Sequence, residues 1–210
     1  AGDGNFFDGT ASAGLDRPLV KSNGCYIFDV DNDGDNDIYV STMGDEQFYL
    51  YVNQDGAGHF REEAMQRGLD NSKTKGRKHL YKNLGKRLFE DVTDASNVRE
   101  SGWGWGAFLF DFDNDGDLDA LNGNGMDDPE TTDDDWAVNQ HMKLYVNHGE
   151  DESFRMVDEA KLRGIENTQE NRGAMTFDYD NDGDLDVFVV NHAESPSFYR
   201  NDGGNYYDFL

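Results

Sequence analysis

Aspartates at alternating positions are the residues of this sequence best suited to do chemistry. The stretch DFDNDGDLD, residues 111–119, carries an aspartate at every odd position of nine. In an extended strand, a period of two would send all five carboxylates to one face. Two such charges about 4 Å apart repel by roughly 1 kcal/mol in water and by about 4 kcal/mol at a protein surface. The pattern therefore predicts a cation among the carboxylates.

The same nine-residue order occurs three times. DVDNDGDND occupies residues 29–37, and DYDNDGDLD occupies residues 178–186. A single acidic run is usually a solvated loop, but three copies with fixed Asn and Gly positions argue against that interpretation. Asn-Asp-Gly is a turn signal, because glycine adopts positive φ freely. We therefore expect each copy to be a tight loop between two extended segments.

The ligand chemistry of these loops favours calcium. Carboxylates that converge from loop positions 1, 3 and 5 offer hard oxygen atoms at flexible spacing. Magnesium demands stricter octahedral geometry. Zinc is disfavoured, because the chain has one cysteine and its five histidines form no closely spaced ligand pair. An EF-hand would need Glu at position 12, where this chain has Val40, Asn122 and Val189. The aspartate at position 9 is the better candidate to complete each site.

The segments around the loops predict β-strands. CYIFDV, GAFLFDF and AMTFDY precede them, and DIYVS, DALNG and DVFVV follow them. These segments are short, rich in β-branched or aromatic residues, and bounded by Gly or Asn. A second unit recurs from residues 48, 79, 143 and 197, with Tyr-x-Asn, a Gly turn, and then Phe or Tyr beside an acidic residue. The two hairpins together make a four-strand repeat, and the offset from Asp111 to Asp178 is 67 residues.

Four-strand repeats of this length indicate propeller blades. The repeats resemble the FG-GAP or VCBS type of β-propeller, which occurs in integrin α-subunit heads and in secreted proteins similar to cartilage acidic protein. The resemblance covers nearly the whole chain, and GWGWGAFLFDFDNDGDLD from residue 102 is its most typical copy. It implies an all-β fold, a partial β-propeller of about three to four blades with four antiparallel strands each.

The resemblance also implies about three bound calcium ions. In that family, the side chains at loop positions 1, 3, 5 and 9 and the main-chain carbonyl at position 7 bind Ca²⁺. Carried over, the ligand side chains are Asp29, Asp31, Asp33 and Asp37 in the first loop, Asp111, Asp113, Asp115 and Asp119 in the second, and Asp178, Asp180, Asp182 and Asp186 in the third. The carbonyls are those of Asp35, Asp117 and Asp184.

We expect residues 1–210 to form one propeller region. Its repeats are a partial blade at 1–22, a blade at 23–71, a degenerate or truncated blade at 72–98, and blades at 99–165 and 166–210. Phe60 and Phe89 lie only 29 residues apart, whereas Phe89 and Phe154 lie 65 apart. Either the short blade has lost two strands, or the sequence omits a segment near residues 76–79. We favour omission, because half a blade would leave an unpaired sheet edge.

The formal net charge of −26 limits the classes of partner. Nucleic acid and anionic membranes both need clustered Lys and Arg, so neither is expected as a partner. No apolar run approaches the length that spans a membrane, so membrane insertion is not expected. The resemblance implies an extracellular protein, secreted or at the cell surface, whose partners are proteins, further copies of itself, or glycans. The acidic cluster MDDPETTDDDW from residue 126 is either a solvated loop or a partner or cation site.

The sequence favours a structural or adhesive role over catalysis. Outside the loops it shows no Ser-His-Asp order, phosphate loop or paired-carboxylate signature. The alternative is a carbohydrate-active, lyase-like enzyme or a glycan-binding module, since some calcium-loop propellers belong to polysaccharide lyases. Trp103, Trp105 and Trp136 could stack on sugars, although packing between blades is their more common role. Cys25 is expected to be a small buried strand residue rather than a nucleophile.

Overall fold

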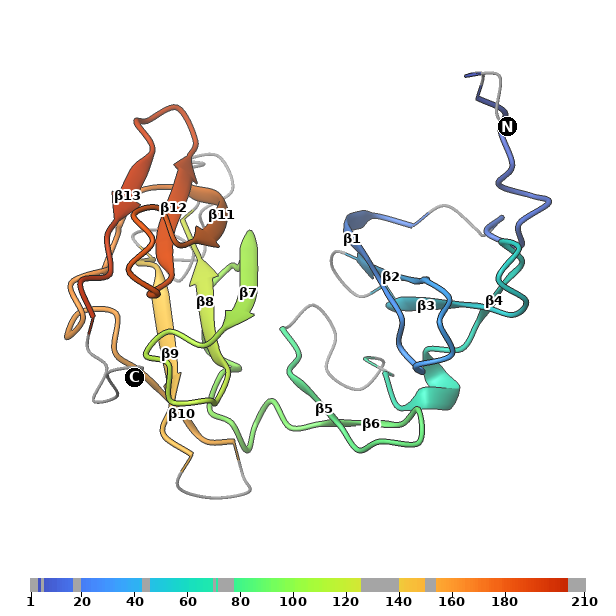
Figure 1. The fold of residues 1–210 in the computed structure, drawn as a ribbon, viewed down its shortest axis with the longest axis horizontal. Helices are drawn as coiled ribbons and strands as arrows, with labels where there is room; N and C mark the ends of the chain where they lie inside the picture. The colour runs from blue at the N-terminus through green and yellow to red at the C-terminus, as the bar shows by residue number, and fades with distance from the viewer. Residues whose placement is uncertain are drawn as a thin grey trace. The chain divides into compact units, whose positions relative to one another are not determined.

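The computed structural model describes residues 4, 6–16, 20–42, 46–69, 71, 78–125, 140–149 and 154–203. The chain divides into two compact units, Ala1–Val92 and Thr93–Leu210. Each unit has its own antiparallel sheets and its own core, and Figure 1 labels the strands of both.

The first unit contains a four-stranded sheet in the order β1-β2-β3-β4. A short 3₁₀ turn, η1 (Met65–Arg67), follows this sheet and ends at Gly68, which has a φ of 87°. A two-stranded sheet, β5-β6, comes next. The strand bounds are β1 Ser22–Phe28, β2 Asp37–Thr42, β3 Tyr49–Asn53, β4 Phe60–Glu62, β5 Tyr81–Asn83 and β6 Phe89–Asp91.

The second unit contains a four-stranded sheet, β10-β9-β8-β7, and a three-stranded sheet, β11-β12-β13. Strands β7 and β11 lie beside each other, and a Cβ added to Gly106 would lie 3.3 Å from the Cα of Gly173. Glycine at both positions allows this close approach. The strand bounds are β7 Gly106–Phe110, β8 Asp119–Gly123, β9 Lys143–Asn147, β10 Met156–Asp158, β11 Asn171–Phe177, β12 Asp186–Asn191 and β13 Ser197–Tyr199.

The pairing register places each aspartate loop at the end of a hairpin. Phe28 pairs with Asp37, Phe110 with Asp119, and Phe177 with Asp186. Loop position 9 is therefore the first residue of the returning strand, and positions 1–8 form the connection. The sequence supports this geometry, because β-branched and aromatic residues flank a centre of Asn, Asp and Gly.

A core of apolar side chains lies beneath the loops in each unit. Residues from both sheets of the second unit form one cluster: Phe110, Leu121, Met142, Leu144, Val146, Ala160, Ile165, Val187 and Val189. A smaller cluster in the first unit comprises Val30, Leu50, Val52, Ala64 and Leu69, with Tyr39, Tyr81 and Phe89 packed against it. Fully burying one such side chain stabilises a fold by about 1.5–3 kcal/mol, so these clusters hold the hairpins in place.

The prediction of an all-β fold with antiparallel sheets is confirmed. Within the described ranges, η1 is the only helical element. No helix there is long and apolar enough to cross a membrane. The sheet at residues 81–91 has two strands in the described part of the chain, and residues 72–77, next to the suspected omission, lie outside it. The acidic cluster that begins at residue 126 lies outside it as well, and so does the end of the last Tyr-x-Asn unit, residues 204–210.

The expectation that Cys25 is buried is wrong. This residue is exposed, as is every other residue of β1. The sequence of β1 has the composition of a buried strand, but among the described strands β1 lies at the sheet edge and pairs only with β2. Burial depends on a neighbouring sheet, which a strand's own sequence does not specify.

Candidate metal centres

The three aspartate loops share one backbone conformation. The asparagines at position 4, Asn32, Asn114 and Asn181, have φ between 55° and 63°. The glycines at position 6 have φ between 94° and 97°. Asparagine tolerates the left-handed region better than most residues, and glycine enters it without steric cost. This requirement explains why Asn and Gly are fixed in all three copies.

The aspartate at position 1 folds each loop around its own carboxylate. Asp29 accepts hydrogen bonds from the N–H groups of Asp33 (3.2 Å) and Gly34 (2.9 Å). Asp111 accepts the matching pair at 3.1 and 3.0 Å, and Asp178 accepts one from Gly183 at 3.2 Å. The hydrogen bond from Gly34 is the main cause of the lowered pKa of Asp29. These bonds hold the carboxylates of position 1 at the centre of each loop.

The aspartate at position 9 joins each loop to the next hairpin. Asp37, Asp119 and Asp186 are at most 1% exposed. One carboxylate oxygen accepts the N–H of loop position 2, and the other accepts the N–H of the Asn in the following Tyr-x-Asn segment. These bonds measure 2.8 Å in the first two loops and 2.9 Å in the third. The repeated Tyr-x-Asn segment therefore supplies a hydrogen-bond donor to the loop that precedes it.

The side chains at position 7 pack against a glycine of the Tyr-x-Asn unit that follows the loop. A Cβ on Gly56 would lie 2.7 Å from both carboxylate oxygens of Asp35, and one on Gly203 would lie 3.0 Å from Asp184. Asp117 lies against Gly149 in the same way. The main chain at this position faces the loop, because its N–H donates to the carboxylate of position 5 at 2.9–3.0 Å. The side chain at position 7 lies outside the group of carboxylates that could share one ion.

Each loop brings three carboxylates close enough to share one ion. In each group, one carboxylate oxygen per residue lies within 4.8 Å of the other two. The first loop contributes Asp29, Asp31 and Asp33, the second Asp111, Asp113 and Asp115, and the third Asp178, Asp180 and Asp186. Position 9 joins the group only in the third loop, where it takes the place of Asp182. The structure thus gathers nine of the twelve predicted ligand side chains into these groups, with Asp37, Asp119 and Asp182 outside them.

Among the residues that the structure describes, one buried carboxylate oxygen in each loop lacks a hydrogen-bond partner. These atoms are Oδ1 of Asp31, Asp113 and Asp178. An unpartnered buried polar atom is costly, and for a charged group the cost is larger. Three such atoms at the centres of three matching loops fit a missing ligand with positive charge. The donor set is all oxygen, which suits a hard divalent cation.

The electrostatics of the loops agree with this fit. Burial raises the pKa of Asp31 and Asp113, and the neighbouring charges of Asp33 and Asp115 raise them further. Burial also raises the pKa of Asp119 to about 6, although the hydrogen bonds from the N–H groups of Asn147 and Phe112 lower it. The charged forms are therefore disfavoured without a cation.

The second and third loops are linked to each other within the second unit. The side chain of Asn114 donates to Oδ1 of Asp184 at 2.8 Å. The side chain of Asn201 donates to the carbonyl of Phe112 at 3.0 Å. We therefore expect a change in the conformation of one loop to alter the conformation of the other.

Sequence reasoning missed two arginines near the first loop. Arg67 and Arg87 both form ion pairs with Asp31. A signal for the first was present, because Arg67-Gly68-Leu69 has a counterpart in Arg163-Gly164-Ile165. Arg87 lies in the turn between β5 and β6, and the sequence gives no sign that this turn reaches the loop.

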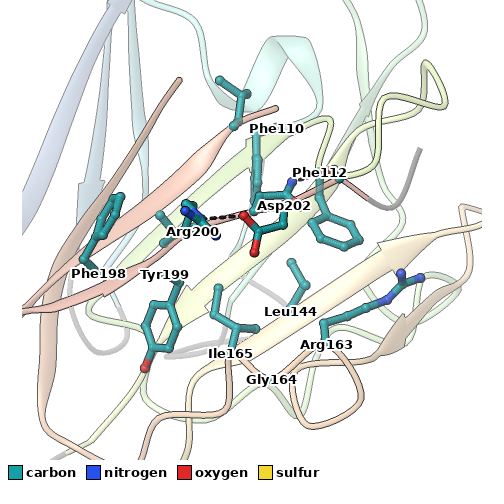
Figure 2. A pocket seen from close by; sticks show the side chains of 14 residues that line it. Phe110, Phe112, Leu144, Arg163, Gly164, Ile165, Phe198, Tyr199, Arg200 and Asp202 are labelled. Carbon is teal, nitrogen blue, oxygen red and sulfur yellow. Dashed lines mark hydrogen bonds and ion pairs between the residues drawn. The ribbon is translucent and has the colours of Figure 1, made fainter. Parts of the chain in front are cut away.

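A pocket of about 440 Å³ lies in the second unit and is lined by residues of both sheets. Figure 2 shows its apolar side chains, including Phe110, Leu144 and Ile165, and the ion pair of Arg200 with Asp202. In the described part of the chain, Asp202 is the only carboxylate that lines it. The described residues of its lining include no histidine, but they include Tyr199 and the arginines Arg163 and Arg200.

The tryptophans give little support to sugar binding. The rings of Trp103 and Trp105 lie 5.7 Å apart at an angle of 39°. The guanidinium of Arg172 covers the Trp105 ring at 4.5 Å, which places a cation where a sugar would stack. Trp136 lies outside the described residues.

A scan against protein-family models gives no match, and a search of curated proteins gives none either. The case for metal binding therefore rests on the three loops themselves.

Proposed function

We propose that this chain is an extracellular calcium-binding protein with a structural or adhesive role, built from repeats of the β-propeller type. The observation that carries the proposal is the buried, unpartnered carboxylate oxygen in each of three matching loops. Calcium suits an all-oxygen site of this flexibility, and millimolar calcium outside cells would fill sites of modest affinity.

The ligands that we assign are the side chains at loop positions 1, 3, 5 and 9 and the carbonyl at position 7. Bound calcium would supply positive charge where each loop concentrates negative charge. The carboxylate at position 1 accepts a hydrogen bond from a main-chain N–H of the loop, and the carboxylate at position 9 accepts one from the third strand of the sheet. Each ion would thus hold together two hairpins of one repeat, which is a structural role.

A role in a larger assembly is supported by the first unit. Tyr26, Ile27 and Phe28 of β1 are 57%, 66% and 41% exposed. Neighbouring apolar side chains at an exposed strand are typical of a surface that another protein, or another copy, covers. The alternative role, in carbohydrate chemistry, has less support, since the carboxylate that lines the pocket of the second unit, Asp202, is paired with Arg200, and Arg172 lies over the Trp105 ring.

The direct test is calcium titration of the chain by calorimetry after removal of bound metal. We expect about three ions per chain. A variant with Asp31, Asp113 and Asp180 changed to Asn should lose most of the binding. The matched control changes three exposed acids outside the loops, Asp16→Asn, Glu90→Gln and Glu194→Gln, and should keep it. Equal binding by the two variants, or none by the parent chain, would refute the proposal.

A further inference from the structure

The three loops differ in the cations that surround position 3. Oδ2 of Asp31 lies 3.2 Å from Nη2 of Arg67 and 3.3 Å from Nη1 of Arg87. The side chains of Asp31 and Arg67 are 1% and 7% exposed, so water screens this pair little. Arg67 is also held by Glu63 at 2.8 Å. Two positive charges therefore stand beside the first loop.

The corresponding carboxylates of the other loops, Asp113 and Asp180, form no such ion pair among the described residues. Arg163 acts on Asp113 only through longer-range electrostatics. Arg163, the counterpart of Arg67, pairs instead with Glu159 at 2.8 Å and lies over the ring of Phe112 at 5.0 Å. Loop position 2 is Phe112 in the second loop but Val30 in the first. Only the aromatic ring offers a face that attracts a guanidinium.

This inference rests on the proposed calcium binding. We propose that Arg67 and Arg87 lower the calcium affinity of the first loop, so that it is the weakest of the three sites. Both guanidinium groups would repel a divalent cation bound in the loop. Both also form ion pairs with Oδ2 of Asp31, so this oxygen is less available as a ligand. Oδ1 stays available, so the site is weakened and not abolished. The first loop then responds to changes in calcium at concentrations where the other two loops are already filled.

The test is a calorimetric titration of the metal-stripped full chain with calcium chloride at constant ionic strength. We expect two tighter binding events and one at least tenfold weaker. Asp33→Asn should remove the weak event, and Asp115→Asn should remove a tight one. Arg87→Gln should tighten the weak event at least threefold, because it removes one of the two positive charges beside Asp31. The Arg87 side chain is 54% exposed, so its loss leaves the core intact. Lys86→Gln is the matched control, since Lys86 is the neighbouring exposed cation and also has positive φ.

Three indistinguishable affinities would overturn this inference and leave the proposed function standing. The same holds if Arg87→Gln and Lys86→Gln change the weak event equally, or if Asp115→Asn removes that event. A chain that binds no calcium would overturn both. The result that supports the inference is a weak event that Asp33→Asn removes and that only Arg87→Gln tightens.

Discussion

At the scale of single residues, the aspartates of each loop divide their work. Position 1 organises the loop, position 9 connects it to the next hairpin, and position 3 leaves a buried oxygen free in the first two loops. Sequence alone predicts that the carboxylates converge, because spacing and turn residues are local properties. It does not distinguish their roles, because the role of position 9 depends on main-chain amides 15 to 28 residues further along the chain.

The buried carboxyl groups predict an unusual pH dependence for the metal-free chain. The pKa of Asp119 is raised to about 6, so its contribution to stability is fully present below about 3.8 and is lost as pH rises through 6. Acidification from pH 7 to pH 5 should therefore raise the melting temperature of the metal-free chain. Groups with lowered pKa, such as Asp29 and Asp55, act only at lower pH.

This effect is measured by circular dichroism after calcium has been removed on a chelating resin. Asp119→Asn should show a smaller rise between pH 7 and pH 5, which separates this group from the general loss of negative charge. A melting temperature that falls with acidification in the parent chain would contradict the prediction.

The turn glycine beside position 7 should resist substitution. Gly149 has a φ of 60°, and the carboxylate of Asp117 occupies the space that a Cβ would need. Gly58 also has positive φ, at 90°, but nothing lies within 4 Å of its Cβ position. Gly149→Ala should therefore destabilise the chain by about 1–3 kcal/mol more than Gly58→Ala, the range typical of overpacking. Urea unfolding of both variants in calcium gives the comparison, and equal losses would show that the contact is unimportant.

At the scale of elements, the stability of the hairpins depends on the apolar core below the loops. Leu144 of β9 is 1% exposed in the core of the second unit. Leu144→Ala should lower the free energy of unfolding by about 2–5 kcal/mol, from lost burial and the cavity left behind. Leu162→Ala, in a turn where the side chain is 77% exposed, should change it by less than about 0.5 kcal/mol. Urea denaturation measures both values, and a similar loss in the two variants would contradict this view of the core.

The hairpins themselves could be predicted from sequence, whereas the packing between them could not. Strand periodicity and Asn-Asp-Gly turns are short-range signals, so the pairs Phe28 with Asp37 and Phe110 with Asp119 follow from them. The ion pairs of Asp31 join it to Arg67 and Arg87, which lie 36 or more residues further along the chain. The exposure of Cys25 follows from the edge position of β1 among the described strands. A single sequence carries no direct signal for such contacts.

At the scale of the whole molecule, charge is the dominant property. The formal net charge is −26, and three calcium ions would reduce it to about −20, since −26 plus 6 is −20. Self-repulsion of this size opposes a compact state. The predicted cations act where the repulsion is strongest, within the loops, so a small change in total charge can have a large effect on stability.

Chelation should therefore lower the melting temperature strongly. Ions that bind only the folded chain stabilise it by mass action. With a Kd of about 0.1 mM and about 2 mM calcium, each site contributes roughly 1.8 kcal/mol, and three contribute about 5 kcal/mol. That is comparable to the net stability of a whole domain. Thermal melts with calcium and with excess chelator, both at the same ionic strength, measure the difference. The variant with Asp31, Asp113 and Asp180 changed to Asn should respond weakly to the chelator, and a parent melting curve that the chelator leaves unchanged would show that the loops do not depend on calcium.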